Sequence, residues 1–386
     1  MRNESLAGEG FVAAFLWLSV VAGFTAMGGP VTGHPDAAMH AARFAGLDTP
    51  FDGGFFPRGN VPHGFTLHWT APFDLAVRAL SYVIDPFLGA RSDEFALRVF
   101  SPFCIASAGV WAFVGLRSHL PFKARLIATL CATTAPAVVN YSLGGRADQH
   151  ALALALAIMF AVSTLRGFTS SKLATAFSAG AIGAFATWTS PEGFMAVGCC
   201  AAALVASRCL LAESPSKRAA LFDGVLFAAM GAISGAALVA DPPSAGLTAP
   251  VLDRHSILYA AFPWFAAVCA LLADSLRARG VSPVKALAVT SFFGAVAAGL
   301  WASINPDILS GPMSEVASPA VREWLGGVTE MRAVWDAGSV GTGIAAGMAV
   351  VAVALGHLVR HDVANRRVWL LFAGLLAVFA VVGATH

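Results

Sequence analysis

Charge is the property that this sequence has least of. Only 12% of its 386 residues are Asp, Glu, Lys or Arg, whereas 57% are hydrophobic and the mean hydropathy is +0.72. A chain with so little charge does not stay soluble in water, so the composition excludes a soluble globular protein. The formal net charge of +2 gives no reason to expect a nucleic-acid partner. The sequence therefore predicts an integral membrane protein that crosses the bilayer many times and is surrounded by membrane lipids.

Two further features are missing. The six cysteines form no CxxC pair and fall inside or at the ends of apolar runs, which excludes a disulfide framework and indicates small buried side chains. No small-residue cleavage pattern clearly interrupts the first apolar run, residues 11–27, which is long enough to span a bilayer. We therefore expect this run to be the first membrane helix and not a cleaved signal peptide.

Long apolar runs dominate what is present. They predict an all-α polytopic membrane protein with about eleven transmembrane helices in a single domain, residues 1–386, and no soluble domain. Two long segments, residues 29–96 and 304–336, are predicted to be large loops on the outer side; the first is rich in Pro, Gly and aromatics and should lie on the membrane surface. The predicted spans are residues 10–28, 97–115, 124–142, 149–166, 172–188, 192–211, 219–240, 255–274, 283–303, 338–358 and 367–385.

Segment 72–88 decides the topology. It is apolar but carries Asp74, Arg78 and Asp85, so we interpret it as an amphipathic or re-entrant helix. With this segment outside the bilayer, 15 of the 24 basic residues, including all four lysines, fall in inside loops; a span here would put all four lysines outside, against the positive-inside rule. The same topology places 16 of the 22 acidic residues on the outer side, an excess that topology alone does not require.

The stretch from Gly144 to His150 is the most polar turn between two apolar runs. It contains Arg146, Asp148 and His150 directly after the pair Gly144 and Gly145, which supplies the bend. Asp148 falls where the next helix is predicted to begin. One interpretation is structural, with Asp148 as a helix N-cap and His150 as a first-turn residue. The other is a polar site at the outer membrane surface.

Two more acidic residues fall at predicted helix starts on the outer side. After Pro35, the residues Asp36, His40 and Arg43 share one face of a short helix, where they could serve a metal ion or a phosphorylated ligand. The alternative there is a solvated surface helix with an acid near its N-terminus. Glu192, which follows Ser190-Pro191, is interpreted as a cap or interface residue.

A third outer acid completes a candidate metal site. Glu330 and Arg332 lie just before the span predicted at 338, although Glu330 has the alternative role of anchoring that span. Asp36, Asp148 and Glu330 then meet at one membrane surface from three distant positions. Together with His150 they form an oxygen-rich set suited to Mg²⁺ or Mn²⁺, whereas a zinc site would want more His or Cys.

These motifs, in this order, resemble the membrane half of oligosaccharyltransferase catalytic subunits, within the GT-C class of polyprenol-dependent glycosyltransferases. The match rests on Asp36, on the Asp-x-Asp-like motif at 148–150 and on the Ser-Val-Ser-Glu-like motif at 327–330. His150 in place of the second acid looks like the archaeal variant, and Glu330 falls between the ninth and tenth predicted spans, where the family keeps its glutamate. The family's C-terminal soluble domain, which reads the acceptor sequon, has no counterpart in these 386 residues.

The resemblance implies a GT-C-like fold and a metal-assisted membrane glycosyltransferase. The enzyme would transfer a sugar or oligosaccharide from a polyprenyl-(pyro)phosphate donor to an unknown acceptor, in a prokaryotic plasma membrane with its site facing the outside or periplasm. The implied residues lie on the outer side: Asp36, Asp148 and Glu330 as catalytic residues, these three with His150 as ligands of Mg²⁺ or Mn²⁺, and Arg58, Arg146 and Arg332 as contacts for the lipid-linked sugar donor.

Two alternatives come from other functional classes. A transporter or flippase would need ionisable groups near the middle of its spans, and the predicted spans hold nearly none there. A non-catalytic oligosaccharyltransferase-like membrane protein would share the fold without the transfer reaction.

The topology can be tested by cysteine accessibility. Single cysteines at Ser92 and Ser314, in an otherwise cysteine-free chain, should both be labelled from the outer side, because both segments are predicted to lie on one face of the membrane. Labelling of the two positions from opposite sides would refute the eleven-span topology.

Overall fold

The computed structural model describes residues 2–31, 35–46, 55–56, 65–66, 70–170, 172–211, 217–252 and 254–306. Several predictions fall outside this range: the spans at 338–358 and 367–385, the outer loop beyond residue 306, and the candidate residues Arg58, Glu330 and Arg332.

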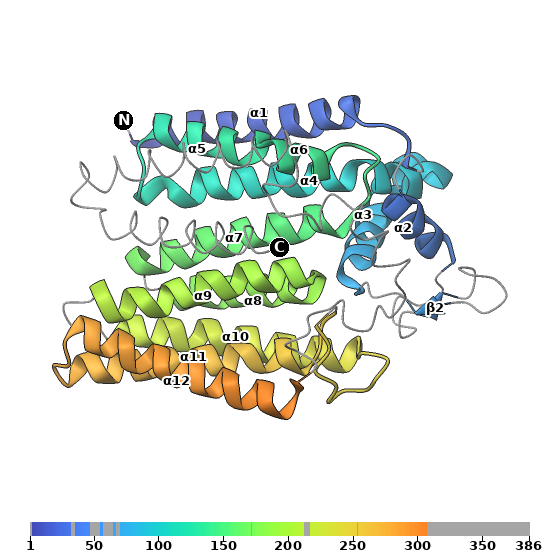
Figure 1. Cartoon of the computed structure of the whole chain (residues 1–386). Coiled ribbons are helices and arrows are strands. Elements are labelled where there is room, and N and C mark those ends of the chain that lie inside the picture. Colours follow the sequence, from blue (N-terminus) through green and yellow to red (C-terminus); the bar gives the residue numbers. More distant parts are fainter. Residues whose placement is uncertain are drawn as a thin grey trace.

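Ten helices form the body of the described chain (Figure 1). They cover the nine spans predicted within it, because α5 and α6 together cover the span predicted at 124–142. They are α1 (Arg2–Met27), α4 (Ser92–Gly115), α5 (Phe122–Thr134), α6 (Pro136–Ser142), α7 (Gln149–Ser170), α8 (Leu173–Thr189), α9 (Pro191–Leu211), α10 (Lys217–Ala240), α11 (Ile257–Ala278) and α12 (Pro283–Ile304). The other elements are short or lie at one end: α2 (Pro35–Gly46), β1 (Phe55–Phe56), antiparallel β2 (Phe65–Thr66), α3 (Pro72–Leu88), and the 3₁₀ turns η2 (Gly89–Arg91) and η3 (Leu116–Ser118).

The number of eleven spans is not confirmed. Within the described residues, seven helical stretches are long and apolar enough to cross a membrane. Two of the four remaining spans, those predicted at 338–358 and 367–385, lie outside the described residues, and the other two have local causes. Pro136 has no backbone N–H and breaks the predicted span at 124–142 into α5 and α6, with Ala135 in an extended conformation at ψ 137°. The helix α8 has only 17 residues.

The long helices alternate in direction, so the turns between them lie at two opposite ends of the bundle. These two ends differ in the charged residues that they carry. The turn after α4, the start of α8 and the turn after α11 lie at one end of the bundle. The turn at 143–148, the α8–α9 junction and the loop at 241–256 lie at the other end. The basic residues that the positive-inside rule uses gather at the first end: Arg117, Lys123, Arg125, Arg166, Lys172, Arg208, Arg277, Arg279 and Lys285. This end is the one predicted to face inward, and the second end carries Asp148.

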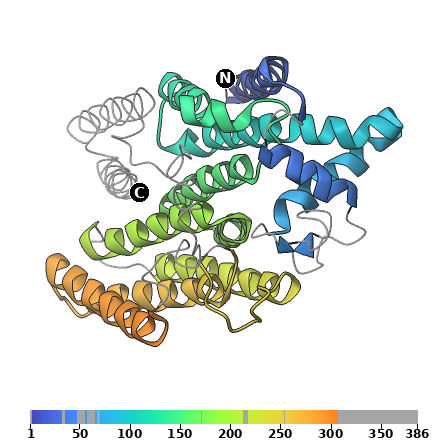
Figure 2. The ribbon, with the colours of Figure 1, turned by 45° about the vertical axis from the view of Figure 1, so that its right-hand side comes forward.

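Helices α2 and α3 lie together at this second end, beside the ends of the long helices (Figures 1 and 2). Phe73 of α3 packs edge-on against Phe100 of α4 with ring centroids 5.3 Å apart, so the predicted surface segment is helical and fixed to the bundle. Ser92 at the start of α4 is only 6% exposed, whereas the neighbouring Glu94 is exposed, which makes position 94 the better place for a topology label.

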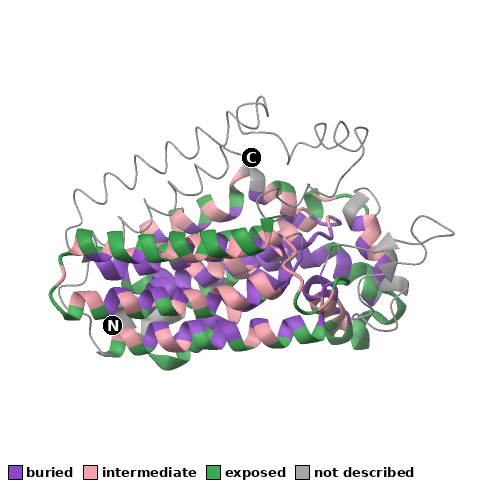
Figure 3. Cartoon of the chain, turned by 60° about the horizontal axis from the view of Figure 1, so that its bottom comes forward, coloured by how far each residue is buried: buried purple, intermediate pink, exposed green. Residues whose placement is uncertain are grey.

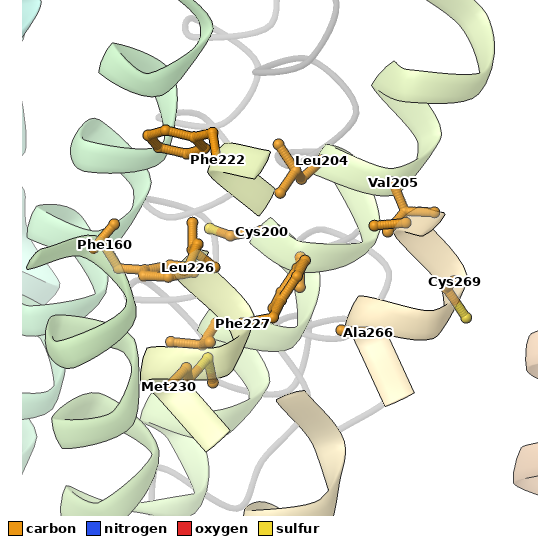
Figure 4. Close-up of a cluster of buried hydrophobic side chains, with 14 of the residues drawn as sticks. Phe160, Cys200, Leu204, Val205, Phe222, Leu226, Phe227, Met230, Ala266 and Cys269 are labelled. Carbon is orange, nitrogen blue, oxygen red and sulfur yellow. The ribbon is translucent and has the colours of Figure 1, made fainter. Parts of the chain in front are cut away.

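The core between α7 and α11 depends on small residues that let helices approach. A Cβ atom on Gly180 would lie 2.3 Å from the Leu226 carbonyl oxygen of α10, and one on Gly183 would lie 2.8 Å from the Phe160 ring of α7. Phe160 and Leu226 belong to the buried apolar cluster shown in Figure 4. Exposed residues run along the outer sides of the helices (Figure 3), as on α12, where Phe292 is 72% exposed. Such a surface suits contact with lipid.

The polar turn before α7 is held by a contact between two glycine pairs. A Cβ atom on Gly28 would lie 1.9 Å from the Gly144 carbonyl oxygen, and one on Gly145 would lie 2.2 Å from the Gly29 carbonyl oxygen. Gly145 also has φ +81°, which favours glycine. The Gly144 amide donates a hydrogen bond to the carbonyl oxygen of Phe24 in α1 at 2.9 Å. The end of α1 and the turn before Asp148 therefore meet backbone to backbone.

This contact gives a sharp substitution test. Gly28→Ala should lower the free energy of unfolding by about 1–3 kcal/mol or more, because the new methyl group would overlap backbone atoms that have no side chain to move aside. Gly29→Ala is the matched control, since a Cβ atom there meets nothing within 4 Å. Thermal melting of the detergent-purified proteins measures both, and equal melting temperatures would contradict the proposed close approach.

Candidate functional site

Asp148 and His150 hold each other at the start of α7. The Asp148 Oδ1 atom is 2.6 Å from His150 Nδ1 and accepts a hydrogen bond from the His150 backbone amide at 3.0 Å. The carboxylate therefore caps α7, as the structural interpretation predicts. The cap uses only Oδ1: the second oxygen, Oδ2, is buried and accepts no hydrogen bond within the described part of the chain. Capping thus leaves Oδ2 facing the Arg146 guanidinium, whose Nε lies 3.6 Å away.

The Asp148 carboxylate is firmly ionised. Burial by itself would raise its pKa, but the hydrogen bonds from the His150 side chain and amide, with the positive charges of His150 and His40, lower the pKa to about 2. Because the pKa falls below its unfolded value, these contacts stabilise the fold above about pH 4, and their contribution is lost as the pH falls toward 2. Asp148 is therefore negatively charged at physiological pH, and its charge faces His150, whose own pKa the same hydrogen bond helps to raise to about 10, and the Arg146 guanidinium.

Arg146 and Tyr141 enclose this pair. The Arg146 guanidinium lies 4.4 Å from the centre of the Tyr141 ring, donates to the Asn140 carbonyl oxygen at 3.1 Å, and places Nε 3.6 Å from Asp148 Oδ2. The Tyr141 ring also packs against His150 with centroids 5.1 Å apart. The structure thus brings the predicted Arg146 beside Asp148. Sequence reasoning did not single out Tyr141, one of only three tyrosines in the chain.

Glu192 joins the site from α9, where the sequence suggested only a cap or interface residue. Its Oε1 atom is 3.6 Å from His150 Nε2, and its side chain is 60% exposed. The cap of α9 is Ser190, whose Oγ accepts a hydrogen bond from the Gly193 amide at 3.1 Å. The two ring nitrogens of His150 therefore face two carboxylates, Asp148 from its own helix start and Glu192 from the next one in space.

A buried ion pair joins α2 to α3 at the same end of the bundle as Asp148, His150 and Glu192. Asp74 of α3 lies 3.1 Å from His40 Nδ1 with one oxygen and 3.1 Å from Arg43 Nη1 with the other. All three side chains are at most 4% exposed. The face of α2 predicted to carry a ligand site is therefore bound to α3 through His40 and Arg43. Asp36 lies at the second position of the same helix, and its side chain is outside what the structure describes.

A second buried carboxylate, Asp241, anchors the segment that leads into α3. It accepts hydrogen bonds from the Ala71 amide at 2.9 Å and Trp188 Nε1 at 3.0 Å, and it pairs with Arg254 Nη2 at 2.7 Å. Thr70 also donates to the Trp188 carbonyl oxygen at 2.5 Å. Sequence reasoning missed this anchor, because its members come from four separate stretches and none stands in a recognisable motif.

An apolar hollow of about 270 Å³ lies next to the site, between α3, α7 and α8. Two of its lining residues are close in sequence to polar residues of the site: Leu152 lies two residues after His150, and Thr189 lies three residues before Glu192. The remaining lining residues are Pro72, Leu75, Ala76, Leu156 and Phe185.

The described residues contain only part of the predicted metal site. No group of three His, Cys, Asp or Glu side chains placed to hold a metal ion occurs among them. The chemistry of the part that is described fits a hard cation, since Asp148 is ionised and its buried Oδ2 accepts no hydrogen bond there. Glu330 and the side chain of Asp36 lie outside the described residues, so the four-residue set remains a prediction.

Removing the ion pair between α2 and α3 should destabilise the packing of these two helices against each other. Asp74→Asn is expected to destabilise the protein by about 3–5 kcal/mol, because it removes the negative charge that lies 3.1 Å from the buried Arg43 guanidinium. Asp85→Asn, at the exposed end of the same helix, is the control and should change little. Thermal melting in detergent compares them; a loss no larger for Asp74→Asn than for Asp85→Asn would show that the pair does not hold α2.

No family model and no curated protein matches this sequence. Solved structures do match, and those found include the archaeal oligosaccharyltransferase of Archaeoglobus fulgidus in several states. Its apo form is 14% identical with a TM-score of 0.61, covering 98% of this chain and 50% of that one. The complex of the enzyme, AglB, with an inhibitory peptide and a dolichol-phosphate is 13% identical with a TM-score of 0.59, covering 99% and 50%. The complex with Zn and sulfate is 14% identical with a TM-score of 0.55, covering 89% and 43%.

This likeness establishes the fold. The chain spans about half the length of the archaeal enzyme, and the sequence identity of 13–14% is too low to carry an activity across. The resemblance to the membrane half of oligosaccharyltransferase catalytic subunits, first indicated by three short motifs, is thereby confirmed in three dimensions. The chain has an oligosaccharyltransferase-like membrane fold.

Proposed function

We propose that this protein is a membrane glycosyltransferase that transfers a sugar or oligosaccharide from a polyprenyl-(pyro)phosphate donor to an acceptor at the outer face. The observation that carries the proposal is the ionised Asp148, which is hydrogen-bonded to His150 at the end of the bundle opposite the basic residues and whose Oδ2 accepts no hydrogen bond among the described residues but lies 3.6 Å from Arg146 Nε. It stands in a fold shared with an oligosaccharyltransferase. Fold alone would not identify a function, but a charged, preorganised pair at this place is what such transfer requires.

The site is proposed to use a divalent cation, Mg²⁺ or Mn²⁺. Asp148 and His150 would hold it together with Asp36 and Glu330, and it would supply positive charge to stabilise the departing phosphate. One archaeal structure of this fold contains Zn, which supports a divalent metal without identifying the ion used here.

The chain's own residues supply the other functions. Asp36, near the start of α2, is proposed to orient the acceptor nucleophile or remove its proton. Arg146, Arg58 and Arg332 are proposed to contact phosphate oxygens, for which guanidinium geometry is suited. In the described part, Arg146 is the one of these three seen beside Asp148.

A lipid-linked donor agrees with the surface around the site. The hollow between α3, α7 and α8 is lined mainly by apolar side chains, and its lining residues Leu152 and Thr189 lie two and three residues from His150 and Glu192 in the sequence. An archaeal enzyme of this fold was solved with a dolichol-phosphate, which supports a polyprenol-type donor. The apolar hollow and the dolichol-phosphate of the archaeal enzyme together support a donor that combines an apolar chain with a phosphate group.

A transporter function receives less support. The buried pair of Arg208 and Asp223, with Asp274 nearby, lies toward the opposite end of the bundle from Asp148. Arg208 is bound to Asp223 through two contacts of 2.7 and 2.9 Å, as expected of a structural pair. A transport path would need ionisable groups that connect the two ends.

Asp148→Asn tests the proposal directly. In cells that lack the gene, cell-surface glycans and glycoproteins should change by mass spectrometry. The wild-type gene should restore them, whereas Asp148→Asn should restore less than about 1% of the product, because an amide is neutral and a poor ligand for a hard cation.

Asp93→Asn is the control for charge and expression, since Asp93 is an exposed acid at the same end of the bundle. It should restore the glycans in full. Full restoration by an Asp148→Asn protein present at the wild-type level would refute the catalytic role, and an unchanged glycan profile after deletion would refute the glycosyltransferase function.

A further inference from the structure

Arg146 faces the Asp148 oxygen that helix capping does not use. Its Nε atom lies 3.6 Å from Asp148 Oδ2. The other oxygen, Oδ1, is 2.6 Å from His150 Nδ1 and accepts the His150 backbone amide at 3.0 Å. Because Asp148 is ionised, the His150 ring nitrogen at that distance carries a hydrogen and donates it. Each oxygen of this carboxylate therefore has its own cationic or hydrogen-donating neighbour.

The backbone of Arg146 is fixed within the turn. Ser101 Oγ of α4 donates to the Arg146 carbonyl oxygen at 2.6 Å, and the Arg146 amide donates to the Leu143 carbonyl oxygen at 3.1 Å. The preceding Gly145 amide donates to the Arg98 carbonyl oxygen of α4 at 3.0 Å. The side chain thus starts from a fixed point, and its rotations alone decide where the guanidinium lies.

The guanidinium has two supports that do not involve Asp148. It lies 4.4 Å from the centre of the Tyr141 ring, and its Nη1 atom donates to the Asn140 carbonyl oxygen at 3.1 Å. Stacking on an aromatic face and a hydrogen bond both stabilise a guanidinium. The contact with Asp148 Oδ2, at 3.6 Å, is longer than a hydrogen bond and is electrostatic only. Arg146 can therefore leave Asp148 and remain on α6.

A divalent cation bound to Asp148 needs the same oxygen, because Oδ1 is engaged by His150. Mg²⁺ binds carboxylate oxygens at about 2.1 Å, so the cation and a guanidinium nitrogen 3.6 Å from Oδ2 would lie only a few ångströms apart. The Asp148 side chain is 1% exposed, and charges in such a place are poorly screened by water. The two positive charges therefore compete for one oxygen.

We propose that Arg146 is a tethered counter-ion that competes with a divalent cation for Asp148 Oδ2 and withdraws onto Tyr141 when the cation binds. This role rests on the proposed metal-assisted function and adds to it a control of cation affinity from the same turn. The exchange keeps a positive charge beside Oδ2 throughout, so the buried carboxylate is never left without a partner. The withdrawn guanidinium is then the group proposed above to contact phosphate oxygens.

Cation binding tests this role without any acceptor or donor. The affinity of the full-length, detergent-purified chain for Mn²⁺ is measured by electron paramagnetic resonance. Arg146→Gln should bind Mn²⁺ about 10–100-fold more tightly than the wild type, because the competing charge is gone. Arg98→Gln removes an exposed arginine at the same end and should change the affinity less than about twofold, since solvent screens its charge. The gain should vanish in the double variant with Arg146→Gln and Asp148→Asn.

Added guanidinium separates competition from a change in the fold. In Arg146→Ala, guanidinium chloride at a non-denaturing concentration should lower the Mn²⁺ affinity toward the wild-type value, whereas sodium chloride at the same concentration should not. The wild type should respond to both salts alike, because its own guanidinium holds this place. Melting temperatures without metal show whether each variant is folded; if Arg146→Ala does not fold, the comparison of Arg146→Gln with Arg98→Gln decides.

The outcomes separate this role from the function on which it rests. If the wild type binds Mn²⁺ and Arg146→Gln binds it no more tightly, the role of Arg146 is overturned and the metal site stands. A gain of equal size in Arg98→Gln also overturns the role, because the loss of any positive charge at this end would then explain it. If neither the wild type nor Arg146→Gln binds Mn²⁺, the metal site of the proposed function fails as well.

Discussion

The close approach of Gly28–Gly29 to Gly144–Gly145 is the constraint on which the site depends. Two backbones meet where a side chain on Gly28, Gly144 or Gly145 would overlap the opposite chain, so the end of the first membrane helix and the turn before α7 have one relative position. That position places Asp148 at the start of α7 and beside α2, which follows α1 directly. Four residues without side chains thus connect the first membrane helix to the most polar stretch of the protein.

Buried carboxylates at this end of the bundle each hold a different pair of elements. Asp74 joins α3 to α2, Asp241 joins the loop after α10 to the segment before α3, and Asp148 joins the first turn of α7 to Arg146 of the turn before it. An unpaired charge in such an environment is destabilising, so each of these contacts limits how its elements can move. Asp74 and Asp148 each keep one buried oxygen, Oδ2, that accepts no hydrogen bond among the described residues. This oxygen lies 3.1 Å from Arg43 Nη1 in Asp74 and 3.6 Å from Arg146 Nε in Asp148, so each faces a guanidinium charge.

Hydropathy predicted the helices well, since a lipid environment requires long apolar runs with every backbone group bonded within the helix. It did less well where a local event interrupts a run, as at Pro136, because apolar composition does not show a break in hydrogen bonding. Asp148 and His150 were predictable because their motif is contiguous. The parts played by Glu192 and Asp241 were not, because each depends on which helix ends become neighbours, and neither periodicity nor spacing within one helix contains that information.

The break at Ala135–Pro136 also has a mechanical consequence. Bilayers differ in thickness, and a helix adjusts to a mismatch mainly by tilting. A continuous rod from α5 through α6 would carry any tilt straight into the turn that bears Asp148. Pro136 removes the hydrogen bond that would make the two helices one rod, so the connection from α5 to the seven residues of α6 is jointed. A change in the tilt of α5 is therefore not transmitted rigidly to the turn that bears Asp148.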